Sequence, residues 1–255
     1  MFRRILSALV LAAVTGLLSP IVRADVLTLQ PDATGVDDVF LYAGFPTTNF
    51  QVGFPTYAPL LGASYFPIGG DHTTQSYIRF SDFSSLPVFN QNEVTSVTLG
   101  LTTRPILAGT GEDPNISNPV TISLYEVSAD WSENTLTWNN KPGIGVSPLS
   151  TNTITAVAAD NSIVSTWNIP VSLFLSWLNS PSTNYGVAIT RDAADWRGAG
   201  PPPDDYGVMF RSSDYSTASA RPYLQIVTGG EIPEPTSFAI LALGAALVQS
   251  RRRRA

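Results

Sequence analysis

The chain has 255 residues, of which 44% are hydrophobic and 13% are charged, so it has ample material for a buried core. It contains no cysteine, which excludes disulfide bonds and thiolate metal sites. It also has one histidine, His72, which excludes zinc catalysis because that chemistry needs several His or Cys ligands. Stability outside a cell would therefore depend on packing or on a bound metal.

The first 24 residues have the layout of a secretory signal peptide. Arg3 and Arg4 precede an apolar run at 5–18, and Val22-Arg23-Ala24 predicts cleavage before Asp25. The apolar run is shorter than the roughly 20 residues that a membrane-spanning helix needs. We therefore interpret residues 1–24 as a cleaved signal peptide and expect the protein to be exported.

The C-terminal residues 231–255 form a second targeting pattern. A Pro-Glu-Pro motif precedes the apolar run Phe238–Val248, and an arginine cluster follows, which should stay in the cytoplasm. This layout resembles the PEP-CTERM sorting signal of Gram-negative bacteria. The resemblance implies a hydrophobic helix, transient inner-membrane anchoring, processing by an exosortase-type protease, and delivery to the cell surface or extracellular matrix. The motif residues are Pro233, Glu234, Pro235, Arg251, Arg252, Arg253 and Arg254.

Loss of both ends would make the remaining domain strongly acidic. Residues 1–24 and 251–255 hold seven of the fourteen basic residues, which leaves twenty acidic against seven basic residues and a net charge of −13. An acidic domain repels nucleic acid and anionic membranes, so neither is an expected partner. Abundant carboxylates suit calcium, which prefers oxygen ligands.

The region 25–230 has the pattern of an all-β domain. Short segments with alternating apolar residues predict strands, and apolar spacing after Pro170 predicts one short helix over 170–178. Residues 44–70 and 191–205 are predicted to be long loops. The pattern favours a single antiparallel β-sandwich of the jelly-roll type. Strands are predicted at 26–29, 39–42, 74–80, 94–102, 120–127, 151–157, 163–168, 184–190, 208–211 and 223–227.

The segment Trp131–Pro142 contains two tryptophans separated by turn-forming residues. It predicts a loop, a short strand at 135–138, and a turn at 139–142. Trp131 and Trp138 could stack on sugar rings, or they could anchor the core through their large apolar surface. Glu133 is expected to bond backbone N–H groups of the turn rather than to act on a substrate.

The order of motifs along the chain resembles the DNRLRE domain, a β-sandwich module related to carbohydrate-binding modules of family 96. The resemblance covers nearly all of 25–230, and loops 51–75 and 191–207 look enlarged beside the family pattern. It implies a carbohydrate-binding role and makes the tryptophan spacing a structural signature. The motifs are Tyr77-Ile-Arg79-Phe80, Trp131-Ser-Glu133, Thr137-Trp138-Asn139-Asn140-Lys-Pro142, Asn184-Tyr-Gly186 and Arg221-Pro222-Tyr-Leu224.

Two sets of residues are candidate ligand sites. Asp32, Asp37 and Asp38 could hold structural calcium or could form a solvated Asp-rich turn, and they do not match an EF-hand loop. Loop aromatics could bind sugar, with inserted loops that lack a ligand as the alternative. The candidate carbohydrate-binding residues are Trp131, Trp138, Tyr57, Tyr65, Trp196 and Tyr206.

Catalytic machinery is not visible in the sequence. There is no Gly-x-Ser-x-Gly motif, and no carboxylate pair stands out. We therefore expect a secreted, non-enzymatic module that binds polysaccharide or exopolysaccharide at the cell surface or in the extracellular matrix. The alternatives are a structural matrix protein that acts through protein–protein contacts, and a polysaccharide lyase or hydrolase.

Overall fold

The computed structural model describes residues 23–54, 56, 58–64, 73–89, 92–104, 120–155, 163–191 and 207–230. Within it, Val26–Val227 form one compact unit. Most of the predicted signal peptide and all of the sorting signal lie outside the described residues, as do Tyr57, Tyr65, His72, Trp196 and Tyr206. No helix among the described residues is long and apolar enough to cross a membrane.

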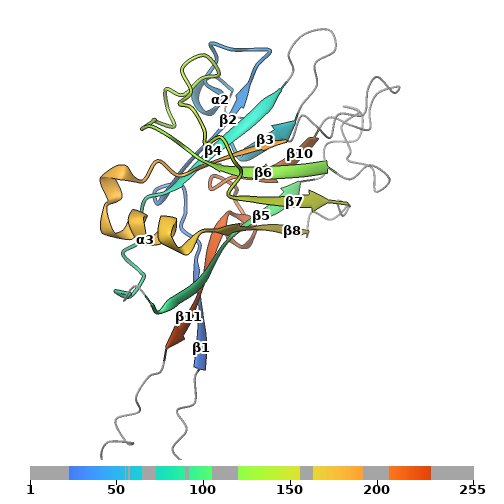
Figure 1. Cartoon of the computed structure of the whole chain (residues 1–255). Helices are drawn as coiled ribbons and strands as arrows, with labels where there is room; N and C mark the ends of the chain where they lie inside the picture. The colour runs from blue at the N-terminus through green and yellow to red at the C-terminus, as the bar shows by residue number, and fades with distance from the viewer. Residues whose placement is uncertain are drawn as a thin grey trace, which may run out of the picture. The chain divides into compact units, whose positions relative to one another are not determined.

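The described chain is mostly β-structure, as predicted, and its strand pairs are antiparallel (Figure 1). The helical elements are α2 (Phe50–Gly53), α3 (Val171–Asn179), and the 3-10 turns η1 (Pro181–Thr183) and η3 (Ala218–Ala220). The strands are β1 (Arg23–Leu29), β2 (Val36–Tyr42), β3 (Leu60–Ser64), β4 (Thr74–Phe80), β5 (Val94–Arg104), β6 (Val120–Glu126), β7 (Ser150–Ile154), β8 (Val164–Ile169), β9 (Val187–Arg191), β10 (Gly207–Arg211) and β11 (Tyr223–Gly230).

The strands form one continuous, curled sheet rather than two separate ones. One layer has the order β2-β4-β9-β6-β7, and the other has β1-β11-β5-β8. Strands β3 and β10 pair with each other and join the layers, because Ser64 pairs with Thr74 of β4 and Phe210 pairs with Thr103 of β5. The result is a sandwich-like fold whose layers share a backbone hydrogen-bond network (Figure 1).

Trp167 on β8 connects the two layers through the core. Its side chain is 1% exposed, and its ring meets Phe210 edge to face at a centroid distance of 5.6 Å. The indole Nε1–H donates to the carbonyl of Ile122 on β6 at 2.9 Å. A buried indole needs such an acceptor, so this bond fixes how the layers align.

Side chains also join the edge strands β7 and β8. Asn152 Nδ2 donates to the carbonyl of Thr166 at 3.1 Å, and the backbone N–H of Asn168 donates to Ser150 Oγ at 3.2 Å. The curled sheet therefore surrounds the core. Backbone pairing joins most neighbouring strands, and polar side chains join β7 to β8, which we call the seam.

Several local predictions were wrong. Residues 184–186, predicted to begin a strand, form a turn before β9. Residues 135–138 are not a strand, because the Ser132 carbonyl accepts hydrogen bonds from the N–H groups of Thr135 and Leu136, at 3.1 and 2.9 Å, and closes a turn. Leu60–Ser64, inside the predicted loop at 44–70, forms β3. Pro170 precedes helix α3 as its N-cap rather than occupying the first turn.

Replacing Trp167 by Phe should destabilise the protein by about 2–4 kcal/mol, because the change leaves a cavity and removes the bond to Ile122. Urea denaturation would measure the loss. Val164→Ala on the same strand is the control, since Val164 is 43% exposed, and it should cost less than about 1 kcal/mol. Equal losses for the two variants would contradict the linking role of Trp167.

Candidate functional site

The segment Trp131–Pro142 is anchored by its first tryptophan. Trp131 is 6% exposed, its ring meets Tyr77 edge to face at 5.8 Å, and the Arg79 guanidinium lies 5.1 Å from the ring centroid. Its indole Nε1–H donates to the carbonyl of Tyr185 at 2.8 Å. Stacking on a sugar needs an exposed ring face, and the Trp131 ring is covered in this structure. Its contacts are those of a core anchor.

Trp138 is half-buried and also makes packing contacts. Lys141 Nζ lies 3.3 Å from its ring centroid, which is the geometry of a cation–π interaction. The ring packs against a hydrophobic cluster that includes Tyr77, Trp131 and Leu136. Both tryptophans of the segment therefore help to hold it in place, and sugar binding by the half-buried Trp138 stays a prediction.

Arg79 secures the same segment through charge. It donates to Asp37 Oδ2 at 2.9 Å, to Asp130 Oδ1 at 2.6 Å and to the carbonyl of Trp131 at 3.1 Å. The hydrogen bond from Arg79 lowers the pKa of the Asp130 carboxyl. Asp37, a candidate calcium ligand by sequence, is thus engaged in an ion pair with Arg79.

Asp32, the second candidate calcium ligand, closes a local turn. Its Oδ1 accepts from the backbone N–H and the hydroxyl of Thr34, at 2.9 and 2.6 Å. These bonds from Thr34 lower the pKa of the Asp32 carboxyl. This is the geometry of an Asx turn on an exposed loop.

The tight turn Asn184-Tyr185-Gly186 positions the Tyr185 side chain. Asn184 is 4% exposed, and it donates to the Phe80 carbonyl at 2.7 Å and accepts from the Gly186 N–H at 3.0 Å. Gly186 has a φ of +72°, and a Cβ there would lie 2.2 Å from the Ile78 carbonyl oxygen. Only glycine fits this position, so the turn has one conformation.

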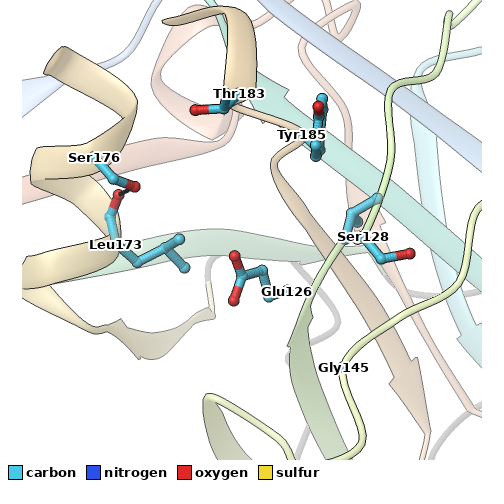
Figure 2. Close-up of a pocket in the computed structure, with 8 residues that line it drawn as sticks. Glu126, Ser128, Gly145, Leu173, Ser176, Thr183 and Tyr185 are labelled. Atoms are coloured by element: carbon cyan, nitrogen blue, oxygen red, sulfur yellow. Dashed lines mark hydrogen bonds between the residues drawn. The ribbon is translucent and has the colours of Figure 1, made fainter. Parts of the chain in front are cut away.

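Tyr185 lines an open groove of about 430 Å³ at the end of β6 (Figure 2). In Figure 2 the Glu126 side chain lies between Leu173 of α3 and Ser128, and Thr183 and Tyr185 come from the neighbouring turn. Ligand sites commonly occupy about 300–1,000 Å³, so the volume suits a small ligand or part of a chain. The lining residues are Glu126, Val127, Ser128, Gly145, Leu173, Ser176, Thr183 and Tyr185.

The groove offers a carboxylate, several hydroxyls and a phenol, which can donate to and accept from the hydroxyls of a sugar. None of its lining residues was among the candidates from sequence. Serine, threonine and glutamate are common on any protein surface. Their presence in the sequence therefore does not predict a binding site until the fold is known. The one available pointer was the motif around Tyr185, which the family resemblance had already singled out.

A cluster of three carboxylates lies where β2, the Trp131–Pro142 segment and the residues after β10 meet. Oxygens of Asp38, Glu133 and Asp214 lie within 4.8 Å of one another. Glu133 Oε1 accepts from the backbone N–H of Asp38 at 3.1 Å, so it bonds a neighbouring strand rather than its own turn. Of the three aspartates predicted as metal ligands, Asp38 is the one that joins such a cluster.

Burial dominates the electrostatics of this cluster. Asp38 is 0% exposed, and the loss of water raises the pKa of its carboxyl well above the usual value. Burial likewise raises the pKa of the Glu133 carboxyl to about 7. The cluster therefore favours either a bound proton or a neutralising cation.

The described residues thus combine a sandwich-like β fold with an open, hydroxyl-rich groove. The sequence model of carbohydrate-binding module family 96 matches residues 62–195, more than half of the chain. The chain therefore belongs to this family. Comparison with curated proteins gives no match.

Replacing Gly186 by Ala should destabilise the protein by at least about 2 kcal/mol, because a side chain at positive φ is strained and would meet the Ile78 carbonyl. Gly53→Ala is the matched control. A Cβ at Gly53 has its nearest neighbour at 3.6 Å, and alanine favours helix α2, so stability should stay equal or rise by up to about 1 kcal/mol. Urea denaturation of both variants tests the difference, and an unaffected Gly186→Ala would contradict the assigned turn.

Proposed function

We propose that this protein is a secreted, non-catalytic carbohydrate-binding protein that holds polysaccharide in the groove beside Tyr185. The observation that carries the proposal is the position of the groove. All of its lining residues, from Glu126 to Tyr185, fall within residues 62–195, the part that matches the carbohydrate-binding family. A β-sandwich module with an open polar groove is an arrangement suited to such a binder.

The chemistry of the groove favours a neutral, hydroxyl-rich glycan. Its described lining includes one carboxylate, Glu126, and no lysine or arginine. A polyanionic sugar chain would meet repulsion from Glu126 and from the net negative charge of the chain. A neutral sugar can bond the carboxylate and the hydroxyls while its apolar face contacts Tyr185 and Leu173.

The same lining supports binding rather than cleavage. Glycoside hydrolysis usually needs two carboxyl groups on either side of the scissile bond, about 5–9.5 Å apart. Among the described lining residues, Glu126 is the one carboxylate. The groove is thus suited to hold a sugar chain without an acid–base pair to cut it.

The binding proposal is tested on a panel of polysaccharides that includes the matrix polysaccharide of the producing bacterium. The purified protein should be retained on at least one of them, and calorimetry would give the affinity. Glu126→Gln should weaken binding about 10–100-fold, because a hydrogen bond to a charged group contributes about 1.5–3 kcal/mol.

The matched control for that test is Glu93→Gln, the same chemical change just before β5 and outside the groove. Its affinity should equal that of the unaltered protein. The proposal fails if no polysaccharide is retained, or if Glu126→Gln binds as tightly as Glu93→Gln.

We further propose that the protein reaches the cell surface or extracellular matrix through transient anchoring in the inner membrane. The support is the sequence layout of residues 1–24 and 231–255, with Pro233-Glu234-Pro235 ahead of the apolar run and arginine cluster. A module that binds polysaccharide would find its ligand there.

Replacing Pro233, Glu234 and Pro235 by alanine should leave the protein in the inner membrane, because the processing protease would no longer recognise it. Fractionation of producing cells followed by immunoblotting would locate both forms. A control that replaces Pro181 by alanine should reach the surface normally. Surface delivery of the triple variant would contradict the proposed sorting.

A further inference from the structure

We infer that Asp38, Glu133, Ser213 and Asp214 form a calcium site that ties three distant segments of the chain together. The site is separate from the groove, and its existence does not depend on sugar binding. Its four oxygen-bearing side chains come from β2, from the turn after Trp131 and from the residues that follow β10.

A buried oxygen atom lacks a partner at this place. Asp38 Oδ2 accepts from the backbone N–H of Ser213 at 2.7 Å, but Asp38 Oδ1 has no hydrogen-bond partner. The Ser213 hydroxyl is buried near the same carboxyl and lowers its pKa. Buried polar atoms are nearly always satisfied in native proteins, so the unpartnered Oδ1 of the fully buried Asp38 points to a missing ligand. This oxygen is an electron-pair donor, as a cation requires.

The charge of the cluster calls for a cation as well. Three carboxylates lie together, one of them fully buried, and burial disfavours their charged forms. Among the described residues, the ion pairs of Arg79 go to Asp37 and Asp130, and none joins the cluster. A divalent ion would restore the balance that no lysine or arginine supplies here.

The spacing and the ligand type are compatible with calcium among the common hard cations. Calcium–oxygen bonds of about 2.3–2.6 Å allow two ligands of one ion to lie at most about 4.6–5.2 Å apart. The carboxylate oxygens lie within 4.8 Å of one another, inside that limit. Magnesium–oxygen bonds of about 2.0–2.1 Å set a limit of about 4.0–4.2 Å, so magnesium would demand a tighter site. An all-oxygen ligand set also disfavours zinc.

Neighbouring amides already hold the ligands in place. Gln51 Nε2 donates to Asp214 Oδ2 at 2.6 Å, and Asn49 Nδ2 donates to the carbonyls of Glu133 and Leu136 at 2.7 and 2.8 Å. Such supporting bonds orient ligands around a metal. Glu133 and Asp214 are only partly buried, which leaves an approach for the ion and for completing water ligands. Bound calcium would thereby fix the turn that carries Trp131.

The direct test is differential scanning calorimetry of the purified protein in EDTA, in calcium and in magnesium. Calcium at about 100 times its dissociation constant should raise the melting temperature by about 5–10 °C, and magnesium should raise it less. Isothermal titration with CaCl₂ should show one site per chain. An unchanged melting temperature together with no heat of binding would overturn the site.

Variants locate the ion. Asp214→Asn and Glu133→Gln should each lose most of the calcium-dependent shift. Asp38→Asn should lose the calcium-dependent shift as well, because it removes a ligand. Asp82→Asn is the matched control: its Oδ1 accepts from the Ser84 N–H in an exposed turn, and it should keep the full shift. A full calcium shift in Asp214→Asn and Glu133→Gln would place the ion elsewhere and overturn the assignment.

Discussion

The hydrogen bond from the Trp131 indole to the Tyr185 carbonyl is the constraint that links the framework of this protein to its binding groove. Trp131 is fixed by Tyr77 and Arg79 of β4, so its N–H has one direction. The acceptor belongs to a turn that Asn184 and Gly186 have already closed. The backbone at Tyr185 is therefore fixed by residues outside the groove lining, and such preorganisation would lower the entropy lost on the proposed binding.

The acidic composition of the domain means that its buried carboxylates need partners that neutralise them. With no cysteine to form disulfides, the chain relies on packing and on polar bonds between distant segments. Arg79 uses one cation to satisfy two carboxylates and a carbonyl. The cluster around Asp38 differs from this arrangement. It brings three carboxylates together, and the described residues provide no cation to neutralise them. Under the proposed calcium binding, such a cluster would gain stability where calcium is abundant.

The local pattern of apolar and polar residues predicted most of the strands. It could not predict which distant residues come together in the groove and in the carboxylate cluster. The sequence alternation over Thr74–Phe80 predicted β4 with its observed bounds, although six of its seven residues are buried in the structure. Leu60–Ser64 was not predicted as a strand, because four of its five residues are buried and its apolar and polar residues do not alternate. Residues 135–138 misled because Asn140 bonds Thr137 and Thr135 and so diverts the backbone into a turn. The pairing of Asp38 with Glu133, 95 positions apart, has no local signature at all.

Strands β7 and β8 are joined more weakly than the backbone-paired strands of the described chain. Asn152 and Ser150 close it with side-chain bonds, whereas the other neighbouring strands of the described chain share backbone ladders. Separation of β7 from β8 would break no backbone ladder. Local opening at this line therefore costs less than opening between paired strands. The curled sheet therefore has its weakest lateral connection at this seam, away from the ladders that hold β4, β6 and β9 together.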